Sequence, residues 1–414
     1  MGSMITLSVG RLEIDWGKNM FFRDHSQLFQ PSDLAPVPYY YVDENDPYTD
    51  EEGHYNLVTV MKDGLSKPLD EVMERVGLLG YTMKVARREF EHLSRLNDLD
   101  TSRFSFDQLV HALATVNVRS LSPDYGEGED FGRFFRRYLF ERIGLDKIVD
   151  DPARVEFMWG ESMENLSAYA ILQAVAQNPS ALGLPVTWQF ADLEEGGWAK
   201  REDFLGDVHK ENQFLIVTEG SSDAQVLRHA LSLLKPHVAD FFYFVDMSEG
   251  YPFTGTGNLH NFAKGLVGIA VRNNVIILYD NDAEGVAGFN RTVGLSLPSN
   301  MRVLRLPDLE EFRDFRTIGP SGVELADING RAAAIECYLD VGSDAVVRWK
   351  NYKRELDVYH GELVEKRDVM RSFLAEGDVR GDCDFSKIAV VIDMIVSECS
   401  AMREVARLAE VAPF

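Results

Sequence analysis

Two stretches of the sequence decide the fold: FLIVTEGSSD at residues 214–223 and VIILYDNDAEG at residues 275–285. Each begins with a short run of apolar residues and passes directly into acidic and small residues. A short, continuously apolar run is typical of a strand that is buried on both faces of a parallel sheet. In such a sheet the functional groups lie at the carboxyl ends of the strands, which is where these acidic residues stand.

The neighbouring sequence repeats the alternation of strand and helix. The predicted segments are, in order, a strand at 214–217, a helix at 222–234, a strand at 241–245, a helix at 259–271, and strands at 275–279 and 303–306. This order predicts an α/β, Rossmann-like fold with a mostly parallel sheet that is covered by helices on both faces.

The length of 414 residues exceeds what one hydrophobic core usually supports, so we expect more than one domain. We expect a mainly helical domain at 1–205 that opens with a short hairpin, the α/β core at 210–310, and an α-rich extension at 311–414 that packs on the core. The helical period is strongest from about 64 to 178, and the polar, glycine-containing stretch 193–210 marks the boundary.

Composition narrows the class of protein. No stretch approaches the roughly 20 apolar residues of a membrane helix, so we expect a cytoplasmic protein without a membrane partner. The three cysteines, Cys337, Cys383 and Cys399, lack the spacing of a zinc site or a disulfide framework. The 67 acidic and 42 basic residues give a net charge of −25, which argues against a broad basic face that coats nucleic acid.

The acidic residues after the strands predict a metal site. Mg²⁺ and Mn²⁺ prefer oxygen ligands, and Asp280 and Asp282 can both turn toward one ion just past a strand. Glu219 would face them from the neighbouring strand, with Asp223 one helical turn later. Four carboxylates can hold two ions roughly 3.5–4 Å apart, an arrangement that hydrolyses phosphodiester bonds. The alternative is that such acids only cap helices, which is the commoner role for any single one, Asp223 in particular.

The pattern also resembles a known family. Glu219-Gly220, followed by Asp280-Asn281-Asp282, resembles the Toprim domain of topoisomerases, primases and several nucleases. With Asp223 four residues after Glu219, it is similar to the Toprim nucleases of the overcoming-lysogenisation-defect family. This resemblance implies a metal-dependent endonuclease in which Glu219, Asp280 and Asp282 are catalytic.

The same resemblance implies two later residues. In the related nucleases a later glutamate completes the second metal position and a later lysine stabilises charge in the transition state. By position, Glu336 and Lys366 are the candidates, so the metal set becomes Glu219, Asp223, Asp280, Asp282 and Glu336. An ordinary role on a helix surface is the alternative for both Glu336 and Lys366.

Residues 12–19, together with 325–336, 347–349 and 359–366, resemble bacterial Toprim proteins that carry an amino-terminal HEPN-like helical domain. This implies an antiphage defence effector that acts as a toxin on nucleic acid, either DNA or RNA, transfer RNA included. It also implies a regulatory protein or ribonucleoprotein partner, and it leaves a homo-oligomer open.

Two other functions are compatible with these residues. One is a noncatalytic Toprim scaffold or regulatory subunit that keeps the acids without turning over substrate. The other is a HEPN-type ribonuclease, because Arg87 and His92 satisfy an Arg-x₄-His pattern. With nine histidines a chance match is expected, and we predict that the pair lies on different faces of a structural helix.

Overall fold

The computed structural model describes residues 2–43, 45–46, 56–121, 131–140, 142–143, 152–245 (152–155 by backbone alone), 255–354, 356–379, 381 and 383–411. The chain divides into two compact units, which are described separately below. The first unit comprises Met1–His209 with Arg403–Phe414, and the second comprises Lys210–Met402. None of the described helices combines the length and the apolarity that a membrane-spanning helix requires.

The first unit contains an antiparallel sheet of five strands. In sheet order these are β2 (Leu12–Lys18), β1 (Met4–Val9), β5 (Pro185–Gln189), β4 (Leu57–Pro68) and β3 (Leu34–Val42). The hairpin predicted at the amino terminus is β1 and β2, but the sheet is larger than we expected. The central strand β5 joins the β1–β2 hairpin to β4 and β3, and its buried Trp188 is paired with Leu7 of β1 and with Leu65 of β4.

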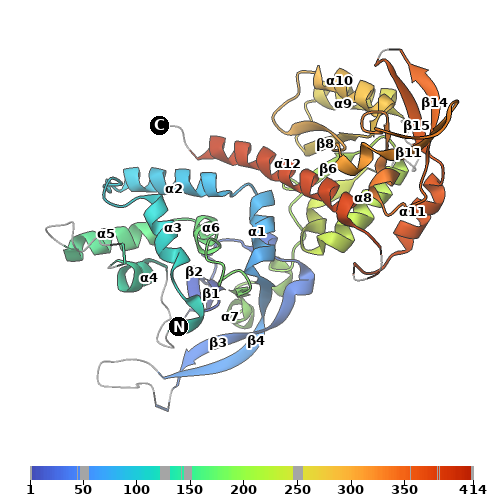
Figure 1. The fold of residues 1–414 in the computed structure, drawn as a ribbon. Helices are drawn as coiled ribbons and strands as arrows, with labels where there is room; N and C mark the ends of the chain where they lie inside the picture. The colour runs from blue at the N-terminus through green and yellow to red at the C-terminus, as the bar shows by residue number, and fades with distance from the viewer. Residues whose placement is uncertain are drawn as a thin grey trace. The chain divides into compact units, whose positions relative to one another are not determined.

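Helices make up most of the rest of the first unit (Figure 1). They are α1 (Leu69–Leu78), α2 (Met83–Leu96), α3 (Phe106–Ala114), α4 (Phe131–Phe134), α5 (Pro152–Glu164), α6 (Ala168–Val175) and α7 (Ala191–Glu195). The predicted start of the helical region at about 64 is wrong, because residues up to Pro68 pair with β5 in the sheet. Aromatic residues fill the helical core, with Phe104 and Trp159 in edge-to-face contact at 4.8 Å.

The second unit is built on the predicted parallel sheet. Its strands, in sheet order, are β10 (Met301–Arg305), β8 (Asn274–Tyr279), β6 (Phe214–Val217) and β7 (Phe242–Phe244). All neighbouring pairs are parallel, so the mostly parallel α/β prediction is confirmed. The helices that connect these strands are α8 (Ser221–Leu234), α9 (Thr256–Gly268) and α10 (Ala283–Val293).

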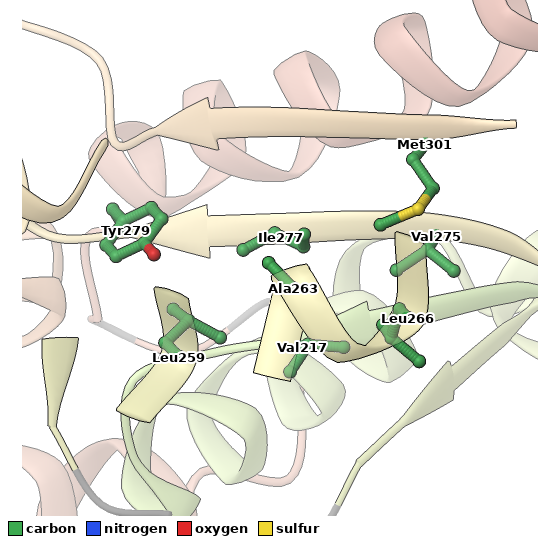
Figure 2. Close-up of a cluster of buried hydrophobic side chains, with 8 residues drawn as sticks. All are labelled: Val217, Leu259, Ala263, Leu266, Val275, Ile277, Tyr279 and Met301. Atoms are coloured by element: carbon green, nitrogen blue, oxygen red, sulfur yellow. The ribbon is translucent and has the colours of Figure 1, made fainter. Parts of the chain in front are cut away.

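The central strand β8 is buried on both faces, as its apolar sequence predicts. Its side chains alternate, and Val275, Ile277 and Tyr279 point toward α9, where they pack around Leu259 and Ala263 (Figure 2). Figure 1 shows α9 and α10 on one side of β6 and β8, and α8 on the other. Helices therefore cover both faces of the parallel sheet.

The predicted α-rich extension is wrong for residues 315–363. This segment forms a second sheet, whose strands in sheet order are β12 (Gly322–Ala326), β11 (Phe315–Gly319), β14 (Val347–Lys353) and β15 (Val358–Leu363). Only α11 (Lys366–Ala375) and α12 (Ser386–Glu410) follow it, and α12 crosses from the second unit into the first at Met402. A hairpin between β11 and β12 turns at glycines 319 and 322, and β11 then pairs with β14, a strand about thirty residues later that local sequence signals do not reveal.

We expect Ile277→Ala to lower the free energy of unfolding by about 2–5 kcal/mol, because Ile277 is fully buried in the core of Figure 2 and its loss leaves a cavity. Chemical denaturation followed by circular dichroism measures the change. The matched control is Val323→Ala on β12, where the side chain is 58% exposed and the change should stay within about 0.5 kcal/mol. Equal effects at both positions would contradict the packing described here.

Candidate active site

The parallel register of β6 and β8 brings Glu219 and Asp280 together. Val217 is paired with Ile277, so the residues that follow both strands leave the sheet side by side. The Asp280 amide donates a hydrogen bond of 3.2 Å to Oε1 of Glu219. The two acids that the sequence placed after separate strands are therefore neighbours at one edge of the sheet.

A two-stranded pairing adds a third segment. Directly after Asp280, β9 (Asn281–Asp282) pairs antiparallel with β13 (Ala332–Ala333). The chain then turns through a 3₁₀ segment, Ile335–Tyr338, which contains the buried Glu336. The Ile335 amide donates a 3.1 Å hydrogen bond to Oδ1 of Asp280. The predicted Glu336 is thus brought beside Asp280, and it does not lie on a helix surface.

Asp282 and Asp223 each stand at the start of a helix, as the capping alternative proposed. Asp282 is the N-cap of α10, and its Oδ1 accepts hydrogen bonds from the amides of Glu284 and Gly285 at 2.9 and 2.7 Å. Asp223 lies in the first turn of α8, and its Oδ2 accepts one from the Gly220 amide at 2.9 Å. Capping occupies only one oxygen of Asp282, so it does not exclude a second role.

The predicted lysine also reaches the cluster. Lys366 is the first residue of α11, and its Nζ is 3.2 Å from Oε2 of Glu336. The Glu336 side chain is 1% exposed, whereas that of Lys366 is 41% exposed. Lys366 therefore connects the enclosed carboxylates with the surface.

Electrostatics place Asp280 in the middle of the cluster. Its burial, and then repulsion by Asp223, Glu219, Asp282 and Glu336, raise the pKa of Asp280 well above its usual range. Burial and repulsion by Asp282 raise the pKa of Glu219 to about 8. The group therefore resists full ionisation, since each new negative charge is repelled by the others.

The carboxyls around Asp280 differ in the charges that act on them, and we call Glu219 with Asp282 the first side of the cluster and Asp223 with Glu336 and Lys366 the second side. Glu219 interacts mainly with Asp282, while Asp223 interacts with Lys366 and Glu336. Burial raises the pKa of Asp223 to about 6, although Lys366 opposes the shift. Burial alone would lower the pKa of Lys366, but Glu336 and Asp280 outweigh it and raise that pKa. The second side therefore contains the ammonium of Lys366, whereas Asp282 on the first side has His360 as its neighbour at 3.7 Å.

The donor chemistry of this cluster fits a hard divalent cation. All five predicted metal ligands contribute carboxylate oxygens, which Mg²⁺ and Mn²⁺ prefer. In addition, Oε2 of Glu336 is buried and its charged partner is Lys366, at 3.2 Å. Among the described residues, however, no three His, Cys, Asp or Glu side chains already surround one point as a coordination shell. Side-chain rotations would have to bring the ligands onto an ion.

The Arg87 and His92 pair lies on α2 of the first unit. Arg87 Nη1 donates a 2.9 Å hydrogen bond to Oδ2 of Asp107, and its guanidinium lies 5.2 Å from the centre of the Phe106 ring. Five residues along a helix correspond to a rotation of roughly 140°, so Arg87 and His92 leave different faces of α2. In the described structure Arg87 is engaged in holding α2 to α3.

Sequence reasoning missed His360 and Lys353. His360 Nδ1 is 3.7 Å from Oδ2 of Asp282, and Lys353 Nζ is 2.6 Å from Oε1 of Glu284. Both lie in the second sheet, which the sequence analysis did not predict. No spacing rule connects them with Asp282, because the pairing of β9 with β13 is what brings the sheet to the cluster.

Comparison with known families assigns the chain. The family model described as HEPN/Toprim N-terminal domain 1 matches residues 1–212, which is slightly more than half of the chain. The chain belongs to this HEPN/Toprim family. Neither a curated protein nor a solved structure matches it. The family match covers residues 1–209 of the first unit, and the carboxylate cluster lies beyond it.

The raised pKa values predict how stability depends on pH in this HEPN/Toprim protein when chelator removes metal ions. Folding raises the pKa of Glu219 from 4.5 to about 8 and that of Asp223 from 3.8 to about 6. The folded state therefore binds these protons more tightly than the unfolded state. The contribution of these two protons to the free energy of unfolding is fully present below about pH 4 and is lost as the pH rises toward 8.

We expect the free energy of unfolding in EDTA to fall between pH 4 and 8, and to fall less in Glu219→Gln, which cannot ionise. Urea denaturation at a series of pH values measures both curves. Glu324→Gln, at an exposed position of β12, is the control and should follow the wild type. If the unfolding free energies of wild type and Glu219→Gln depend on pH in the same way, the carboxyls of the cluster do not repel one another as described.

Proposed function

We propose that this HEPN/Toprim protein is a metal-dependent nuclease that hydrolyses phosphodiester bonds at the carboxylate cluster of the second unit. The observation that carries the proposal is Asp280, which is surrounded by four other carboxyls at the carboxyl edge of a parallel sheet. Perturbed carboxyls that converge in this way are typical of sites that handle charge.

The two sides of the cluster suggest a division of ligands. Glu219, Asp280 and Asp282 would hold one Mg²⁺ or Mn²⁺, and Asp223, Asp280 and Glu336 would hold a second, with Asp280 shared. Ions bound there would supply a water of lowered pKa and neutralise charge on the phosphate. The backbone amides of Asp280, Ile335, Glu284 and Gly285 each donate to one oxygen of Glu219, Asp280 or Asp282, and the second oxygen of each carboxylate could bind an ion.

Lys366 is proposed to stabilise negative charge on the substrate. Its ammonium lies at the boundary between the enclosed Glu336 and the surface, and the neighbouring carboxylates keep it protonated by raising its pKa. A cation in this position can contact a phosphate oxygen as charge develops there. It also offsets part of the acidic charge that would repel a nucleic acid.

A noncatalytic scaffold fits these observations less well. Closely spaced carboxyls whose pKa values are raised by burial and repulsion destabilise the fold above the pH at which they ionise. A cation would relieve that repulsion, whereas a scaffold without one would gain nothing from it. The arrangement therefore favours an ion-dependent function.

We further propose that the enzyme is an antiphage effector under the control of a partner. The net charge of −25 opposes the approach of a polyanion, and a partner with a basic surface would remove this penalty. About half of the chain lies outside the unit that holds the cluster, so it is available for recognition of such a partner.

The central test is cleavage of mixed DNA and RNA pools in Mg²⁺ or Mn²⁺, followed by sequencing of the new ends. We expect cleavage to require the metal and to fall at least about 100-fold in Asp282→Asn, which removes a charged ligand. His92→Ala, on α2 of the first unit, should retain most of the activity. If His92→Ala loses as much activity as Asp282→Asn, the HEPN-type ribonuclease is the better assignment. If neither pool is cleaved under any condition, the nuclease proposal fails.

Control by a partner predicts that the purified full chain cuts slowly and that lysate from phage-infected cells accelerates it. The reason is the electrostatic penalty on substrate encounter, which a basic partner relieves. The measurement is the rate of cleavage with lysate from infected and from uninfected cells, with Asp282→Asn as the background control. Rapid cleavage by the purified chain that neither lysate changes would exclude control by a partner and leave the nuclease assignment intact.

A further inference from the structure

His360 carries an unsatisfied atom beside the carboxylate cluster. Its side chain on β15 is 17% exposed, and its Nδ1 is buried without a hydrogen-bond partner. The nearest charged atom is Oδ2 of Asp282 at 3.7 Å, which is too long for a hydrogen bond. A polar nitrogen that is removed from water without a partner destabilises the fold. A ligand that bound to Nδ1 would remove this cost.

The backbone fixes His360 in this place. The amide of the next residue, Gly361, donates a 3.2 Å hydrogen bond to the carbonyl of Arg331. The backbone of Arg331 in turn forms a β-bridge with that of Asp282, and Ala332 is the strand partner of Asp282 in the pairing of β13 with β9. Strand β15 is therefore held against the segment that holds Asp282, and His360 cannot move away without disrupting these contacts.

Asp282 presents a matching free atom. Its Oδ1 is occupied by the two amides at the start of α10, and Oδ2 is the oxygen that faces His360. A nitrogen lone pair and a carboxylate oxygen that face one another across 3.7 Å can bind one ion, because two metal–ligand bonds of about 2.1 Å can span that distance.

The charges around His360 favour a cation. Asp282 and Glu284 both face the imidazole. Lys353 Nζ lies 2.6 Å from Oε1 of Glu284 and forms an ion pair with it. Asp282 Oδ2 and His360 Nδ1 face each other at 3.7 Å.

We propose that His360 binds metal through Nδ1 and makes the Asp282 side of the cluster selective for Mn²⁺ over Mg²⁺. The inference rests on the proposed metal-dependent function. Carboxylates bind both ions, but an imidazole nitrogen is a ligand that transition metals accept far more readily than Mg²⁺ does. One nitrogen among oxygen ligands therefore shifts the preference at that position. The other side of Asp280, with Asp223, Glu336 and Lys366, offers oxygen ligands alone for either ion.

The experiment uses the full chain loaded with Mn²⁺ and measures electron spin-echo envelope modulation, which detects a nitrogen nucleus bonded to the ion. We expect ¹⁴N modulation in the wild type, its replacement by a ¹⁵N pattern after histidine labelling, and its loss in His360→Asn. The asparagine oxygen can occupy the place of Nδ1, so we expect Mn²⁺ affinity to fall about tenfold. Mg²⁺ affinity, measured by competition, should change less than about twofold.

The control variant is His260→Asn on α9, whose Nδ1 is already hydrogen-bonded to Thr292 Oγ1 at 2.9 Å. It should keep the nitrogen modulation and both affinities. Should His360→Asn fail to fold, His360→Gln and the labelled wild type carry the same test, because the wild-type spectrum alone shows whether nitrogen is bound.

The outcomes separate this inference from the proposed function. If the wild type binds Mn²⁺ and Asp280→Asn abolishes binding, but no histidine nitrogen is detected and His360→Asn keeps the Mn²⁺ to Mg²⁺ preference, then His360 only pairs with Asp282 and the inference is overturned. If the wild type and Asp280→Asn bind Mn²⁺ equally, or neither binds it, the metal-dependent function and the inference fall together.

Discussion

Repulsion among closely spaced carboxyls is the main energetic cost that the structure of the second unit has to offset. Asp280 feels the charge of four other acids, and burial strengthens each of these interactions. Backbone amides offset part of this cost, because they donate hydrogen bonds to Glu219, Asp223, Asp280 and Asp282. Amides are fixed dipoles that cost no side-chain entropy to position, so they hold the acids in place without neutralising them. The remaining charge is what the proposed divalent cations would neutralise.

The same constraint joins the two halves of the unit. The acids after β6 and β8 supply only part of the cluster, and residues from 331 onward supply the Ile335 amide, Glu336, His360 and Lys366. The short pairing of β9 with β13 brings these residues to the edge of the parallel sheet. The second sheet and α11 are therefore part of the candidate active site. This explains why the chain groups residues 210–402 into one compact unit.

Capping and metal binding are compatible at one carboxylate. Asp282 gives Oδ1 to the first turn of α10, while Oδ2 faces His360. The close approach of α10 to the cluster depends on Gly285, where an added Cβ would collide with the carbonyl of Asp280. A helix start that lies on a carboxylate also places its partial positive charge beside the acids. The helix thereby lowers the cost of keeping Asp282 ionised, and it directs the free oxygen.

The sequence by itself determined the parallel sheet and the location of Glu219, Asp223, Asp280 and Asp282 at its edge, because short apolar strands and the residues that follow them are local signals. Glu336 and Lys366 were placed only by resemblance, and the structure brings both to Asp280. The second sheet was mispredicted, since its strands gain their stability from partners distant in sequence. His360 was invisible for the same reason. Its role depends on which atom of Asp282 remains free and on which strand lies beside it, and only tertiary pairing decides either.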